Sequence, residues 1–265
     1  MSEADTAMAA SPLIDSASNH KDIRDFQVFG ERCSGTNYLE HLISENFEAT
    51  CIHHYGWKHA APTMPAIWSH SLILVIVRHP LEWLLSLHRT PYEGAPQLHD
   101  RAFSDFIREE WESIARPRFQ GWEKWGLRKD GRMRGEVLQL DRHPISGRRF
   151  ANALEMRMIK AQAMMGLRNR AGNFALMRFE DLQRNPASLL TRLGARFNLT
   201  AKPAAPKLPT ERLDPKSARL RPRLSARDIV PKDLAFIRTG LDPDLESLLG
   251  YDIDRLTDAA TPGRS

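Results

Sequence analysis

The chain has 265 residues, a hydrophobic content of 42% and a formal net charge of +5, which together favour one domain with a sizeable core and an anionic ligand. Its two cysteines exclude a disulfide framework and suit a reducing, cytoplasmic environment. The longest apolar run, residues 72–77, has the length of a strand, so we expect no membrane span, and residues 1–20 lack the basic start and apolar centre of a secretory signal.

The expected organisation is one domain over residues 23–255. Residues 1–22 are small, polar and without periodicity, which predicts a disordered N-terminal tail. Residues 112–149 are rich in Gly, Arg and Lys and are predicted to form a loop-rich insertion. Residues 256–265 are predicted to be a flexible C-terminal tail.

Residues 26–43 predict a strand, a glycine loop and a helix. A loop of this layout binds phosphate, because backbone N–H groups and the helix dipole point at the anion. Compared with the nucleotide-binding signature G-x-x-x-x-G-K-[ST], Gly30 and Gly35 match, but Thr36 and Asn37 stand at the positions of the lysine and of the Mg²⁺-binding hydroxyl. The loop is therefore a poor match to an ATP or GTP hydrolase, yet it still offers N–H groups and hydroxyls to an anion. An ordinary strand–turn–helix without a ligand is the alternative.

Later segments alternate between short apolar runs and helical patterns. The run 71–77 is continuous and rich in β-branched residues, which is typical of a strand buried on both faces of a parallel sheet. The other predicted strands and helices span residues 49–54, 81–89, 103–111, 150–165, 173–177, 186–197, 231–240 and 241–251. This alternation predicts an α/β fold with three layers, in which helices flank a mostly parallel sheet. Ligands of such sheets lie at the carboxyl ends of strands, so the glycine loop and Arg78 are expected to face one crevice.

Three blocks carry a family resemblance: residues 31–39 (ERCSGTNYL), residues 77–86 (VRHPLEWLLS) and residues 179–186 (FEDLQRNP). In this order they resemble the 5′-phosphosulfate loop, the 3′-phosphate block and the Y-E-D-L-x-x-x-P segment of the sulfotransferases that use 3′-phosphoadenosine 5′-phosphosulfate (PAPS). The resemblance implies a P-loop nucleotide-hydrolase-like fold. It also implies transfer of a sulfuryl group from PAPS, as cosubstrate and without a metal, to a hydroxyl or an amine.

By this resemblance, Arg78 and Ser86 would hold the 3′-phosphate of PAPS, and the glycine loop would hold its 5′ end. The loop residues implied in binding are Arg32, Cys33, Ser34, Gly35, Thr36 and Asn37. The chain departs from the family because Cys33 stands where a basic residue is usual, with Arg32 one place earlier, and because Asn37 replaces a threonine. Residues 202–223 are only a loose candidate for the family's R-K-G segment.

The general base is expected near the end of the second predicted strand. His59 is the first candidate, since the family has a histidine in a K-x-H segment here and an unperturbed imidazole titrates near neutral pH. Lys58 would then steady the bridging oxygen. His53, His54 and Glu82 are alternative bases, and a His59 that only packs or is solvated remains open.

The acceptor is expected to be a small molecule or a glycan that binds at residues 91–150. Trp111, Trp122 and Trp125 could stack on a sugar or an aromatic ring, although partial burial is the usual state of tryptophan. The basic segments do not interleave aromatic residues, so no nucleic-acid partner is expected. Two other functions remain open. Cys33 leaves room for a non-catalytic protein that binds the desulfated nucleotide PAP, and the fold allows a P-loop-like small-molecule kinase, which the missing lysine disfavours.

Overall fold

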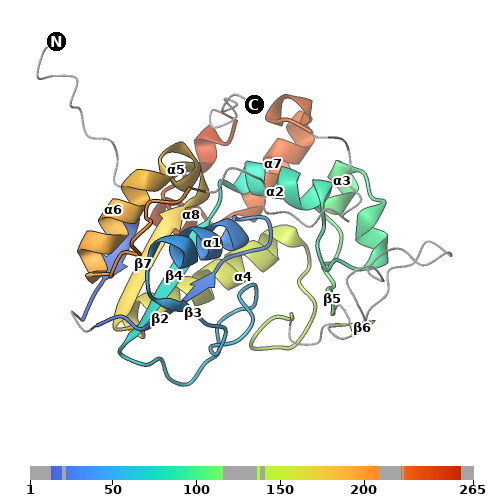
Figure 1. Ribbon diagram of the computed structural model, residues 1–265. Helices are drawn as coiled ribbons and strands as arrows, with labels where there is room; N and C mark the ends of the chain where they lie inside the picture. Colours follow the sequence, from blue (N-terminus) through green and yellow to red (C-terminus); the bar gives the residue numbers. More distant parts are fainter. Residues whose placement is uncertain are drawn as a thin grey trace, which may run out of the picture.

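The computed structural model describes residues 13–19, 22–115, 136–137, 141–208, 222 and 224–257, and these residues form a five-stranded sheet flanked by helices (Figure 1). The strand order is β1–β7–β4–β2–β3. The strands are β1 (Leu13–Ala17), β2 (Asp25–Phe29), β3 (Thr50–Cys51), β4 (Ser71–Val77) and β7 (Asn173–Arg178). All neighbours pair in parallel except β1, which is antiparallel to β7. The predicted α/β fold with a mostly parallel sheet is confirmed.

Strand β4 separates two cores, because successive side chains of a strand point to opposite faces. Leu72, Leu74 and Ile76 pack with α1 (Thr36–Asn46), α5 (Phe179–Arg184) and α6 (Pro186–Phe197). Ile73, Val75 and Val77 pack with α4 (Ala153–Met165) and with α8 (Pro243–Leu248) on the opposite face. The sheet is thus the middle of three layers, as its fully buried β4 residues predict.

A third core joins α4 to the helices beyond the sheet, which are α2 (Pro80–Arg89), α3 (Phe103–Phe106) and α7 (Pro231–Gly240). The short 3₁₀ helices are η2 (Pro96–His99), η4 (Gly166–Asn169), η5 (Ala226–Asp228) and η6 (Ile253–Arg255). Strands β5 (Ile114–Ala115) and β6 (Glu136–Val137) form a separate antiparallel pair. No helix among the described residues is long and apolar enough to span a membrane.

The N-terminal prediction is wrong for β1, because Leu13–Ala17 lies within the predicted tail over residues 1–22 and instead pairs with β7. An edge strand gains its place through backbone hydrogen bonds, so it needs no strong hydrophobic pattern. At the other end, the side chain of Leu256 is fully buried, so the predicted tail over residues 256–265 begins too early. Residues 1–12, most of the predicted insertion at 112–149 and residues 258–265 lie outside the described part of the chain.

Candidate functional site

The glycine loop links the carboxyl end of β2 to the N-terminus of α1. Cys33 and Gly35 both have positive φ angles, 64° and 89°, so the chain turns sharply before Thr36. Gly35 caps the helix without a side chain, which leaves N–H groups of the first turn available to an anion. The hydroxyl of Ser34 is buried and has no hydrogen-bond partner among the described residues. The loop therefore has the donors that an anion site requires.

Both loop glycines are needed for close packing. A Cβ on Gly30 would lie 2.5 Å from the carbonyl oxygen of Ile76 in β4, and a Cβ on Gly35 would overlap the ring of Phe179. Phe179 thus covers the loop from the end of β7. This contact places the block at residues 31–39 directly against the block at residues 179–186.

Replacing Gly35 by Ala is expected to destabilise the protein more than replacing Gly56 by Ala. Gly56 has a similar φ of 99° but open space around a Cβ, so its variant isolates the backbone cost of about 1–2 kcal/mol. The Gly35 variant adds overpacking against Phe179, of about 1–3 kcal/mol. Urea denaturation of both variants measures the difference, and equal losses would contradict the overlap with Phe179.

Arg78 follows β4 and reaches the glycine loop from the neighbouring strand. Its Nη1 atom donates to the carbonyl of Cys33 at 3.0 Å, and its guanidinium lies 5.1 Å from the centre of the Phe179 ring. Its Nη2 atom lies 3.9 Å from Glu82, the alternative base, which is thereby tied to the Arg78 block. Ser86 lies on α2 and is half-buried. The predicted meeting of the glycine loop and Arg78 at one sheet edge is present.

Glu180 and Asp181 lie in the first turn of α5 and contact different parts of the chain. Glu180 accepts hydrogen bonds from the backbone N–H of His79 at 2.8 Å and from the hydroxyl of Tyr251 at 2.9 Å. Burial, together with the charge of Glu180, raises the pKa of Tyr251, so the phenol stays protonated. Asp181 accepts instead from Arg178 at 2.6 Å. Glu180 therefore joins the start of α2 to the C-terminal segment.

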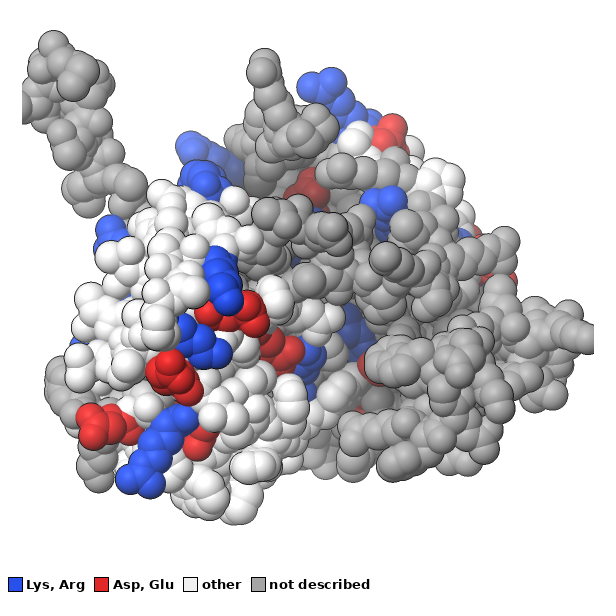
Figure 2. All heavy atoms as spheres, in the orientation of Figure 1, with Lys and Arg blue, Asp and Glu red and all other residues white. Residues whose placement is uncertain are grey.

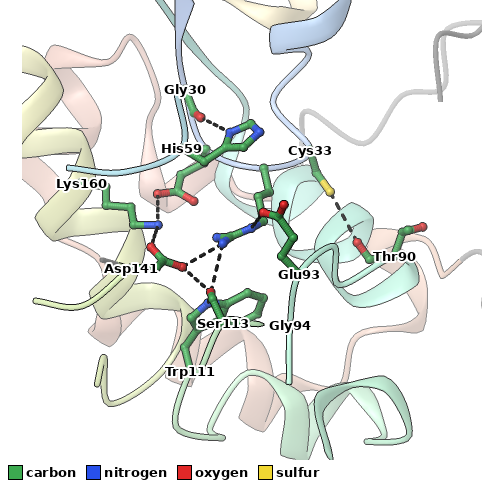
Figure 3. Close-up of polar contacts among 12 residues, drawn as sticks. Gly30, Cys33, His59, Thr90, Glu93, Gly94, Trp111, Ser113, Asp141 and Lys160 are labelled. Atoms are coloured by element: carbon green, nitrogen blue, oxygen red, sulfur yellow. Dashed lines mark hydrogen bonds and ion pairs between the residues drawn. The ribbon is translucent and has the colours of Figure 1, made fainter. Parts of the chain in front are cut away.

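His59 lies directly against the glycine loop, 2.7 Å from the carbonyl oxygen of Gly30 through its Nδ1 atom (Figure 3). Because a carbonyl only accepts, Nδ1 carries the proton and Nε2 is the basic nitrogen. Burial, and then the positive charge of Arg32, hold the pKa of His59 well below its usual range. The imidazole is therefore neutral at physiological pH.

Lys58 is also fixed to the loop and to the first helix. Its carbonyl accepts from the N–H of Gly30 at 3.0 Å, and its ammonium lies 2.6 Å from both Asn37 and Glu40. The two predicted catalytic residues thus flank the start of the loop. Asn37 is exposed and Thr36 is buried at the first turn of α1.

Arg32 does not have the environment expected of a phosphosulfate ligand. Its side chain is 1% exposed and lies in a buried cluster, where it binds Asp141 at 2.8 Å, Ser113 at 3.0 Å and Glu93 at 3.4 Å (Figure 3). Its guanidinium also lies 4.7 Å from the centre of the Trp57 ring. Two carboxylates already offset its charge, so Arg32 is not one of the side chains proposed to bind the anion.

The buried cluster continues from Arg32 through Asp141 to Lys160 and Glu31. Lys160 lies 2.5 Å from Asp141 and 3.5 Å from Glu31. Burial raises the pKa of Asp141, but the charges of Arg32 and Lys160 outweigh it and hold that pKa well below its usual range. Burial also raises the pKa of Glu31, whose carboxylate oxygens have no hydrogen-bond partner among the described residues. The cluster ties the predicted insertion to the loop and to α4.

The sequence analysis did not predict this cluster, although the residue pattern of α4 indicates buried ion pairs. Arg157 and Lys160 fall at helical spacing on the same stripe as Met156 and Met164, which is the buried stripe. Two cations on such a stripe indicate buried carboxylate partners. Arg157 has its partner in Glu246, at 2.6 and 2.7 Å.

Several residues that were expected to bind the acceptor or the nucleotide are buried or lie outside the described residues. Trp111 is fully buried and donates from Nε1 to Ser113 at 2.9 Å, so it is not a stacking platform. Trp122, Trp125 and most of residues 202–223 lie outside the described part of the chain. Figure 2 shows the face of the molecule that is seen in Figure 1. Over the described residues of this face, Lys and Arg are interspersed with Asp and Glu.

Comparison of the chain with protein-family models, with curated proteins and with solved structures gave no match.

Proposed function

We propose that the chain is a sulfotransferase that moves a sulfuryl group from PAPS to a hydroxyl or an amine of a small-molecule or glycan acceptor. The observation that carries this proposal is a convergence at the carboxyl ends of β2 and β4. Arg78, Phe179 and His59 come from three other stretches of sequence, and each contacts the glycine loop there. Open parallel sheets bind their ligands at this edge.

The loop suits an anion through polar groups that have no partner in the described part of the chain. The buried hydroxyl of Ser34 and the N–H groups of the uncapped first turn of α1 would hold the 5′ end of PAPS. Arg78 and Ser86 would hold the 3′-phosphate, for which a guanidinium offers paired donors. PAPS supplies an activated sulfuryl group when bound. The chain then has to position the acceptor in line and take its proton.

His59 is the base in this proposal. Its Nδ1–H is engaged by Gly30, so Nε2 is left to accept the proton of the acceptor. The low pKa of His59 keeps Nε2 unprotonated at neutral pH. Lys58, the residue before His59, carries a positive charge. Its contacts with Asn37 and Glu40 hold its ammonium beside the first turn of α1.

A non-catalytic PAP-binding protein is the second candidate, and one observation favours it. Arg32 and Lys58, the basic residues expected to act on the phosphosulfate, are both paired with carboxylates. Binding of PAP without release of PAP from PAPS in a broad acceptor screen would favour this candidate.

Thermal stabilisation by PAP tests the nucleotide site directly. A ligand that binds the folded state raises stability by mass action, by about 2.7 kcal/mol at one hundred times its Kd. We expect PAP to raise the Tm in a concentration-dependent way, and ATP with Mg²⁺ to leave it unchanged. Arg78→Ala and Ser86→Ala are expected to reduce the shift, whereas the control Arg184→Ala, at an exposed arginine paired with Asp181, keeps it. A shift with ATP and Mg²⁺ but none with PAP would overturn the proposal in favour of a kinase.

A further inference from the structure

A second group of side chains with ligand chemistry lies beside α1, outside the groups proposed to bind PAPS. Glu40 on α1, Cys51 in β3 and His53 just after β3 each offer one atom, and these three atoms lie within 4.8 Å of one another. Cys51 and His53 are two residues apart in an extended segment, so their side chains leave the backbone on the same side. Glu40 approaches from the helix that packs on this edge of the sheet.

Among the described residues, only one of the two carboxylate oxygens of Glu40 has a hydrogen-bond partner. Its Oε2 atom binds the ammonium of Lys58 at 2.6 Å. Its Oε1 atom is buried and has no hydrogen-bond partner among the described residues, and His53 Nδ1 lies 4.0 Å away. A buried acceptor without a donor costs free energy unless another group satisfies it. A cation between Glu40, Cys51 and His53 would satisfy it.

We propose that Glu40, Cys51 and His53 form a zinc site with one thiolate, one imidazole and one carboxylate ligand. Sulfur, nitrogen and oxygen donors in one set select Zn²⁺ over Mg²⁺ or Ca²⁺, which prefer oxygen alone. In tetrahedral Zn²⁺ the bonds are about 2.0–2.3 Å long, so the three atoms need to close in by about 1 Å. The side chain of His53 is 62% exposed, which leaves it free to adjust and leaves the fourth position open to solvent.

Metal binding changes the charge of Cys51. Burial, and then the charge of Glu40, raise the pKa of the Cys51 thiol to about 11, so the thiol is protonated without a metal. Binding of Zn²⁺ releases this proton to solvent. The thiolate and the Glu40 carboxylate then carry two negative charges beside Zn²⁺ and the ammonium of Lys58. The site shares Glu40 with Lys58, but it includes none of the groups proposed to bind PAPS or to take the acceptor's proton, so either proposal can fail without the other.

Titration of the tag-free protein with Co²⁺ tests the site, because Co²⁺ replaces Zn²⁺ and absorbs visibly when it is tetrahedral. We expect a thiolate-to-cobalt charge-transfer band that saturates at one ion per chain and disappears when Zn²⁺ is added. Cys51→Ser removes this band, and His53→Ala weakens Co²⁺ binding by at least about tenfold.

Two matched variants serve as controls, with folding checked by circular dichroism. Cys33→Ser removes the chain's other cysteine and is expected to keep the band. His54→Ala removes the adjacent exposed histidine, which lies in the turn that follows His53 and is not one of the three proposed ligands, and is expected to keep the affinity. Absence of the band at saturating Co²⁺, its persistence in Cys51→Ser, or its loss in Cys33→Ser would overturn the proposal.

Discussion

Replacing Asp141 by Asn is expected to lower the free energy of unfolding by about 3–5 kcal/mol, the range for breaking a buried ion pair from one side. The side chain of Asp141 is fully buried between Arg32 and Lys160, which are each 1% exposed. An amide keeps the shape of the carboxylate but leaves both cations without their shared partner. The midpoint of urea denaturation measures the loss.

The pH dependence of this loss gives an independent check. The pKa of Asp141 in the folded protein lies below that in the unfolded chain, about 3.9. Its charge therefore contributes stability above about pH 4, and this contribution is lost as the pH falls through the folded pKa. The difference between wild type and Asp141→Asn should stay constant from about pH 8 to 5 and shrink below about pH 4.

Glu110→Ala is the matched control, because Glu110 pairs with Arg149 at 2.9 Å but both side chains are exposed, 53% and 41%. Exposed ion pairs contribute little to stability, so the midpoint should hardly change. If Asp141→Asn lowered the midpoint of urea denaturation no more than Glu110→Ala does, the stability of the protein would not depend on the charge of Asp141.

The local pattern of the sequence was sufficient for the elements that position the candidate site. The buried strand 71–77, the glycine loop and the helices that begin at Pro186 and Pro231 follow from period, turn residues and proline at the first helical position. The meeting of the glycine loop and Arg78 at one sheet edge was also predictable, because the carboxyl ends of parallel strands lie at the same edge.

The buried cluster did not follow from local pattern, because its members are far apart in sequence. Arg32 and Asp141 are separated by 109 residues, and Asp141 lies in a segment whose basic composition suggested a solvated loop. Only the contact reveals that an acidic residue of this segment neutralises the loop arginine. The same contact changes the expected role of Arg32, which motif position alone had assigned to the phosphosulfate.

The cluster and His59, the proposed base, are physically coupled. Arg32 and Lys160 both lower the pKa of His59, and Asp141 and Glu31 balance their charges. Burial is the first cause of the low pKa of His59, and the two cations of the cluster lower that pKa further. The cluster also fixes Arg32, which immediately precedes Cys33 in the glycine loop.

Replacing His59 by Ala is expected to lower kcat for sulfuryl transfer by about 10²–10⁴-fold, the usual contribution of a general base. Release of PAP from PAPS, measured with an acceptor found by screening, gives the rate. Since the pKa of His59 lies well below 6.5, kcat/KM of the wild type should stay flat from about pH 8 down through 6.5 and fall only in more acid solution.

Two measurements separate a catalytic His59 from one that only packs against the loop. The Tm shift with PAP should be kept in His59→Ala if the imidazole acts on the acceptor, and should be reduced if the hydrogen bond to Gly30 merely holds the loop. His54→Ala, at an exposed neighbour, should leave both rate and shift unchanged. A kcat of His59→Ala within a few-fold of wild type, or an acid limb of kcat/KM centred at or above about pH 6.5, would contradict the role of His59, because the buried imidazole is already neutral there.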